Sequence, residues 1–164
     1  MDQVDRIVAQ WNSARPDLDV GPMETIGRLY RLAAMLRSEM EKTWKAHGLN
    51  PASFDVLATL RRSGKPDGLS PGELLDLTMV TSGTMTNRVD RLVKGGLVER
   101  VPNPEDKRGF LIRLTEDGMT QIEAAVTDHV KTQHRLMDGF PHKQRGELND
   151  LLRMLTGSVE TDAG

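Results

Sequence analysis

Apolar residues recur at spacings of three and four through the first third of the chain. After Pro22 these apolar positions are Ile26, Leu29, Ala33, Leu36, Met40 and Trp44. The spacing places them on one face of a helix that ends at Gly48. A helix of about 25 residues with one apolar stripe has to bury that stripe, so we expect a partner helix or a second subunit against it. A shorter amphipathic pattern, residues 4–11, precedes it and includes Trp11.

Three shorter helices are expected next, and each follows a capping signal. Asn50-Pro51 predicts the start of the first helix, and Ser70-Pro71-Gly72-Glu73 forms a capping box that begins the second. The third, residues 82–94, is capped by Thr81 or Ser82. It carries Met85, Val89 and Leu92 on its inward face and stops at Gly95-Gly96. The middle of the chain is therefore expected to be a compact group of short helices.

The hydrophobic period then changes. Residues 97–101 and 110–114 are short β-like runs, and the charged segment between them is rich in turn-forming residues, which predicts a hairpin. A long helix is expected after Thr115, and a last one after Phe140-Pro141. The inward positions expected in these two helices are Met119, Ile122, Val126, Val130, Leu148, Leu151, Leu152 and Leu155. The fold class is therefore mainly α with a small β-wing, and the order of elements predicts a winged helix-turn-helix lobe.

The helix over residues 82–94 has a polar face that suits DNA. Three apolar positions pack this helix, and the remaining face carries Ser82, Thr84, Thr86, Asn87, Arg88 and Arg91. Short hydroxyl and amide side chains together with arginine are typical of a helix that lies in the major groove. A solvated helix face is the alternative, but such faces are usually rich in Glu and Lys, and this one has no Glu. We therefore predict contact with double-stranded DNA here.

The net charge of −2 hides a local excess of positive charge. Residues 82–113 hold seven basic and four acidic side chains, a balance of +3, whereas residues 1–81 carry −1 and residues 114–164 carry −4. This basic segment includes the helix predicted to contact DNA and the predicted hairpin. Such a local excess of positive charge is typical of a DNA-binding surface.

Several classes of protein and site are disfavoured. The chain has no cysteine, which excludes disulfides, cysteine-ligated zinc and thiol chemistry. The four histidines, His47, His129, His134 and His142, are scattered, and no catalytic constellation or phosphate-binding glycine loop accompanies them, so an enzyme is not expected. No cofactor and no metal site is predicted. With no signal-like start and no long apolar run, a cytoplasmic protein without membrane contact is expected.

Residues 106–118, which begin Asp106-Lys107-Arg108-Gly109, resemble the wing signature of the multiple-antibiotic-resistance regulator (MarR) family. The resemblance extends over about residues 22–157. It implies that Arg108 enters the minor groove from the wing tip, with Lys107 beside it on DNA, and that Asp106 supports the wing. It also implies a homodimer on a pseudo-palindromic operator. Residues 1–49 would then be an N-terminal extension and dimerisation helix, 50–114 the DNA-binding lobe and 115–164 the C-terminal dimerisation helices.

A narrower resemblance concerns an effector. Trp11, Asp55, Arg88 and Arg100 match the ligand-site positions of the urate-responsive, PecS- and HucR-like branch. Urate is a flat anion, which two arginines can bind in a fork and a tryptophan can cover. The resemblance implies that Asp55 pairs with an arginine in the free state and is repelled when the anion binds. The chain would thus be a repressor that a small aromatic anion releases from its operator.

Alternatives remain open at this point. Asp55 and Arg100 also suit ordinary local ion pairs, and Trp11 suits simple packing of a short helix. Phenolic compounds are alternative effectors because the four residues do not separate them from urate, and zinc is a third. A helical interaction module that does not bind DNA is the alternative of a different class.

Overall fold

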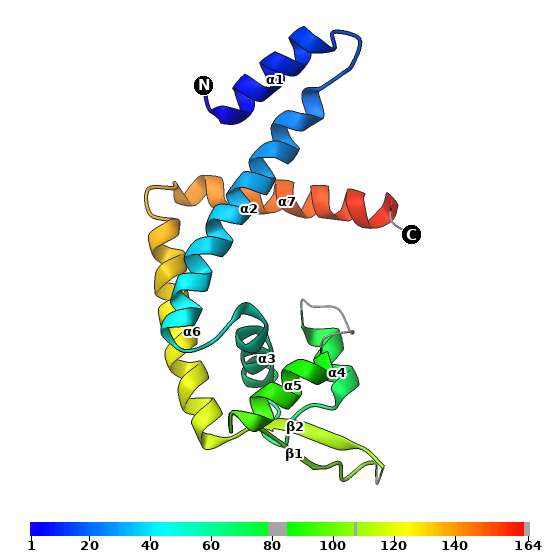
Figure 1. Cartoon of the computed structure of the whole chain (residues 1–164), viewed down its shortest axis with the longest axis vertical. Helices are drawn as coiled ribbons and strands as arrows, with labels where there is room; N and C mark the ends of the chain where they lie inside the picture. The colour runs from blue at the N-terminus through cyan, green and yellow to red at the C-terminus, as the bar shows by residue number, and fades with distance from the viewer. Residues whose placement is uncertain (79–84, 107, 163–164) are drawn as a thin grey trace. The chain divides into compact units, whose positions relative to one another are not determined.

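The computed structural model describes residues 1–78, 85–106 and 108–162 (Figure 1). Two compact units divide it, Met1–Thr132 and Gln133–Gly164. The elements are α1 (Gln3–Ala14), α2 (Gly21–Ala46), α3 (Pro51–Arg62), α4 (Pro71–Leu77), α5 (Met85–Lys94), β1 (Val98–Pro102), β2 (Phe110–Leu114), α6 (Glu116–Leu136) and α7 (His142–Asp162). This confirms the predicted mainly α fold with a two-stranded wing. No helix in the described ranges combines the length and the apolar character needed to cross a membrane.

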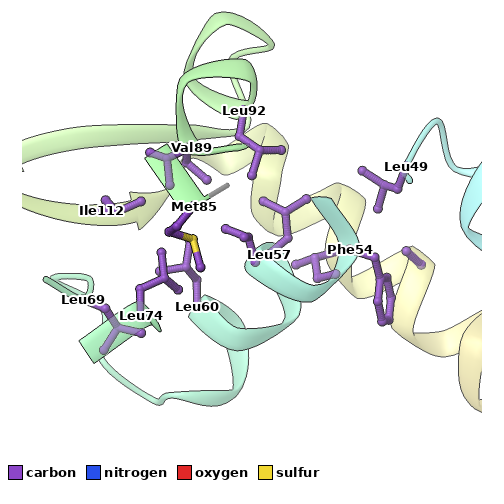
Figure 2. Close-up of a cluster of buried hydrophobic side chains, with 14 residues drawn as sticks. Leu49, Phe54, Leu57, Leu60, Leu69, Leu74, Met85, Val89, Leu92 and Ile112 are labelled. Carbon is purple, nitrogen blue, oxygen red and sulfur yellow. The ribbon is translucent and has the colours of Figure 1, made fainter. Parts of the chain in front are cut away.

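The main core of the first unit lies in the lobe formed by α3, α4, α5, the wing and the start of α6 (Figure 2). From α5 it receives Met85, Val89 and Leu92, which are 6%, 2% and 3% exposed. Leu57 of α3 and Leu74 of α4 are fully buried in the same cluster. Because full burial of one such side chain stabilises the fold by about 1.5–3 kcal/mol, this cluster holds α5 firmly against the lobe. The inward face predicted for α5 is confirmed.

The caps predicted at Asn50 and Ser70 are present, and the cap predicted at Thr81 or Ser82 lies outside the described residues. The Asn50 side chain accepts a hydrogen bond from the Ser53 amide at 2.8 Å, which caps α3. In the capping box of α4, Ser70 Oγ accepts from the Glu73 amide at 3.3 Å and Glu73 Oε2 accepts from the Ser70 amide at 2.8 Å. Lys65 also donates to Glu73 at 2.6 Å, and together with the Ser70 bonds it lowers the pKa of the Glu73 carboxyl to about 2. These contacts fix where the two helices begin.

The wing is an antiparallel pair with Arg100 opposite Ile112 and Pro102 opposite Phe110. A third segment joins it, because Leu69 and Ile112 exchange backbone hydrogen bonds of 2.9 and 2.8 Å. Gly68, just before this bridge, has φ +103°, and a Cβ there would overlap the Ile112 carbonyl. The loop between α3 and α4 is therefore held against β2.

Only the end of the predicted α2 stripe is buried within one chain. Met40 is buried, and the Trp44 ring stacks on Phe54 and His129 with centroid distances of 5.0 and 5.7 Å. Burial lowers the pKa of His129. Toward the start of α2, Ile26 is 45% exposed and Ala33 is also exposed. The apolar face that the sequence predicts is thus present, but a single chain leaves much of it open.

The inward face predicted for α6 is partly wrong. Ile122 is buried as expected, but Met119 and Val130 are 41% and 42% exposed, and Ala125 is buried instead. The reason is Gly118, where a Cβ would overlap the Leu97 carbonyl. Close approach of the helix at this glycine turns positions 118, 122 and 125 toward the core.

The second unit has no buried side chain among its described residues. On α7, Leu148 and Leu155 are half-buried, whereas Leu151 and Leu152 are 62% and 37% exposed, so the inward positions predicted there are not covered within one chain.

Helix α1 belongs to the first unit, where Arg28 of α2 forms ion pairs with Asp2 and Asp5 at its N-terminal end.

Gly118→Ala is expected to destabilise the lobe by about 1–3 kcal/mol, because the added methyl group has no space against the Leu97 backbone. Urea unfolding measures this difference. Gly72→Ala on α4 is the matched control, because a Cβ there meets nothing within 4 Å. Equal stability of Gly118→Ala and wild type would contradict the packing described for α6.

Candidate nucleic-acid interface

The outward face of α5 is polar and accessible. Thr86, Asn87 and Arg91 are exposed, and Arg88 is half-buried. Their positions alternate with the three buried apolar residues of the helix, so the core contacts determine which way they point. The predicted residues Ser82 and Thr84 lie outside the described residues. The described part of the predicted reading face is therefore on the surface, where it can meet a groove of DNA.

Asp106 organises the tip of the wing. Its Oδ1 accepts a hydrogen bond from the Arg108 backbone amide at 2.9 Å, and its carbonyl accepts from the Gly109 amide at 2.9 Å. Asp106 thus fixes the turn through the backbone, and the Arg108 side chain remains exposed. The predicted residue Lys107 lies outside the described residues. A rigid turn that presents an exposed arginine is suited to inserting that arginine into a narrow groove.

Arg100 ties the wing to α5. Its Nη2 donates to Asp90 Oδ1 of α5 at 2.5 Å, and its guanidinium lies 5.2 Å from the centre of the Phe110 ring on β2. A second ion pair, from Arg113 to Glu99 at 2.8 Å, joins the two strands without contact to α5. Since Asp90 is the acidic residue of α5 as described, its pairing also neutralises the negative charge on that helix.

A cleft of about 470 Å³ lies between α2, the start of α3 and α5. Three arginines line it, Arg37, Arg88 and Arg91, and residues 50–53 at the first turn of α3 form another wall. Arg88 Nη1 is buried and has no hydrogen-bond partner among the described residues. No acidic side chain lines the described part of this cleft. Three cations beside the positive end of a helix dipole favour an anion.

The four predicted ligand residues do not come together within one chain. Arg88 lines the cleft, and Asp55 is half-buried on α3, just beyond the cleft wall. Arg100 is engaged by Asp90. Trp11 is 43% exposed on α1, which lies along the first half of α2, whereas α3 packs at the other end of α2 (Figure 1). A site with both Trp11 and Arg88 would need a second copy of the chain.

Sequence reasoning missed Arg37 and the role of Asp90. In the sequence, Arg37 falls on the polar side of the long helix, where a charged side chain is expected to face solvent. The packing of α2 beside α3 places it in the lining of the same cleft as Arg88. The Asn50-Pro51 cap was visible in the sequence, but its place at an arginine-lined cleft was not. Among the described residues, no group of three or more His, Asp or Glu side chains is placed to hold a metal ion.

A family model, a relative in sequence and two solved structures match this chain. The MarR family model matches residues 47–109. The regulator PecS of Dickeya dadantii is 37% identical over 158 residues, which cover 96% of this chain and 93% of PecS. A MarR mutant from Escherichia coli in complex with operator DNA has a TM-score of 0.70 and 27% identity, covering 88% of this chain and 96% of that one. Bordetella bronchiseptica BpsR, whose DNA binding is regulated by 6-hydroxynicotinic acid, has a TM-score of 0.70 and 25% identity, covering 84% and 93%.

Arg100→Gln is expected to loosen the wing from α5, because it removes both the Asp90 ion pair and the contact with Phe110. Amide hydrogen exchange in β1 and α5 should accelerate only about two- to fivefold, because a partly exposed ion pair contributes little stability. Glu99→Gln is the matched control, since it breaks the ion pair that does not reach α5. Equal exchange rates in α5 for the two variants would contradict the linking role of Arg100.

Proposed function

The chain belongs to the MarR family of transcriptional regulators, and we propose that it is a homodimeric, sequence-specific DNA-binding repressor released from its operator by a small aromatic anion such as urate. The observation that carries the DNA-binding part is the geometry of α5. Its apolar side chains are buried in the core, whereas its Thr86, Asn87 and Arg91 side chains are exposed. The same lobe carries the exposed Arg108 at the tip of the wing. This is the combination with which a winged helix contacts a major and a minor groove.

The dimer is supported by apolar surface that one chain leaves uncovered. Large exposed apolar side chains occur on α1, α2 and α7: Ile7, Trp11, Met23, Ile26, Tyr30, Leu32, Met35, Leu151, Leu152, Met154 and Val159. Such a concentration on three helices exceeds the scattered apolar residues of an ordinary monomer surface. We propose that these helices interleave with those of a second copy, so that two lobes read two half-sites of one pseudo-palindromic operator.

The arginine-lined cleft supports the effector. An aromatic anion that enters it can pair with Arg88, whose buried Nη1 lacks a partner among the described residues, and with Arg37 or Arg91. We propose that Trp11 of the second copy covers the ring and that Asp55 is repelled by the bound charge. The pairing of Arg88 with the anion would then shift α5 and weaken its hold on DNA. In this arrangement Arg100 influences ligand binding indirectly, because its ion pair with Asp90 holds α5, the helix that carries Arg88.

An aromatic carboxylate or phenol is the second candidate effector. The observation that favours it is BpsR, a structural relative regulated by 6-hydroxynicotinic acid, which is also a planar ring with an anionic group. Zinc has no comparable support, because the described residues offer no cluster of metal ligands.

Arg108→Ala is expected to weaken binding to a cognate duplex by about 1–3 kcal/mol if the side chain contacts base edges. Fluorescence anisotropy on a duplex selected by the wild-type protein measures the loss. Arg15→Ala removes the same charge at the end of α1, outside the lobe that carries α5 and the wing, and serves as the control. Unchanged affinity of Arg108→Ala would remove the wing tip from the interface.

Urate is expected to quench the tryptophan fluorescence of the dimer, because Trp11 covers the bound ring. Trp11→Phe leaves Trp44 as the only tryptophan and should abolish the quenching, while Arg88→Ala should weaken urate binding. The signal is corrected for absorption by urate itself. Absence of quenching at millimolar urate would reject urate as the effector, and quenching by 6-hydroxynicotinate instead would select the second candidate.

A further inference from the structure

A second pocket, of about 240 Å³, is lined by residues of α3, of the loop that follows it, of β2 and of α6. No described residue of α5 lines it. We call it the α3–β2 pocket. Its apolar lining comes from Leu60, Leu114 and Met119, and its polar lining from Arg61, Lys65 and Arg113. Gly64, Pro66 and Gly68 of the loop after α3 form a further wall, whereas the exposed Asp67 of the same loop is not part of the lining. It shares no residue with the cleft at Arg88.

The walls of the α3–β2 pocket are held in place without a ligand. The loop that forms one wall is joined to β2 by the two backbone hydrogen bonds between Leu69 and Ile112. Gly64 and Gly68 both have positive φ, +67° and +103°, and the close approach of Gly68 to the Ile112 carbonyl leaves no room for a side chain. Little conformational entropy is therefore lost when a molecule enters, which favours binding.

The charge in the pocket is one-sided. Among the described residues that line it, three are cationic and none is acidic. The carboxylates that pair with them lie outside the lining: Glu123 with Arg61, Glu73 with Lys65 at 2.6 Å and Glu99 with Arg113 at 2.8 Å.

These cations can also bind an added anion. All three ion pairs are about half exposed, so solvent screens them and each stabilises the fold only weakly. A guanidinium has five N–H donors and an ammonium has three, and one carboxylate partner does not use them all. The same side chains can therefore donate to a carboxylate inside the pocket.

We propose that the α3–β2 pocket binds a small organic anion that joins one carboxylate to an apolar ring or short chain. The carboxylate pairs with Lys65 and Arg113, while the apolar body covers Leu60, Leu114 and Met119. The pocket is smaller than the 300–1,000 Å³ of sites for drug-sized molecules, which selects a ligand of the size of phenylacetate. An inorganic anion would satisfy the cations but would leave the apolar side chains in contact with water.

The test is a titration with 4-fluorophenylacetate followed by 19F NMR, carried out on an Arg88→Gln background so that the cleft does not contribute. Lys65→Gln with Arg113→Gln should weaken binding about tenfold, because two charge-assisted hydrogen bonds are lost. Lys42→Gln with Lys131→Gln on the same background is the matched control, because it removes two exposed ammonium groups that line neither pocket, and it should change binding less than twofold. The neutral isostere 4-fluorophenylacetamide should bind about tenfold more weakly than the acid.

Circular dichroism and thermal unfolding without ligand establish that each variant is folded, and Lys65→Gln alone replaces the double variant if that one unfolds. Equal binding of the acid to the pocket variant and its parent would overturn the proposal. Equal binding of acid and amide, or competition by inorganic phosphate at matched ionic strength as strong as that by phenylacetate, would overturn the class of ligand assigned to the pocket.

Discussion

The functional surface depends on the burial of three side chains of α5, Met85, Val89 and Leu92. They occupy positions i, i+4 and i+7, so they anchor one face of the helix and leave the opposite face to polar residues. The lobe can hold a helix with so few apolar contacts because Leu57, Leu74 and Ile112 complete the cluster from α3, α4 and β2 (Figure 2). The wing is then positioned relative to that helix by Arg100 and Asp90. A change in any of these contacts would alter the spacing between α5 and the wing, the two parts proposed to contact DNA.

The second feature that organises the molecule is where its arginines lie. Arg91 is exposed on the reading face of α5 and also lines the cleft, and Arg88 on the same helix reaches into the cleft. In the proposed mechanism, an anion in the cleft and the phosphates of DNA would therefore bind the same helix and share Arg91. By linkage, a ligand that weakens DNA binding must itself be bound more weakly when DNA is present. The net charge of −2 conceals this arrangement because most of the acidic residues lie outside residues 82–113.

The sequence predicts the parts of this account that depend on local signals. Caps at Asn50 and Ser70, the inward face of α5 and the wing hairpin all follow from spacing and turn chemistry, and the structure confirms them. Contacts between distant segments were beyond such reasoning. The Gly118 contact with Leu97 rotates α6, so Ala125 is buried instead of Met119 and Val130. Arg37 reaches the cleft only because α2 passes beside α3. The stripe on α2 was predicted, and a single chain leaves part of it exposed.

In the proposed dimer, two lobes bind the two halves of one operator. Selection of bound sequences from a random duplex pool tests this arrangement, because the protein itself selects its target from all sequences in the pool. We expect enrichment of a pseudo-palindrome whose half-site centres are about 10–10.5 base pairs, or 34–36 Å, apart, or a multiple of this. Recovery of no enriched sequence, or of single half-sites without a twofold partner at fixed spacing, would contradict it.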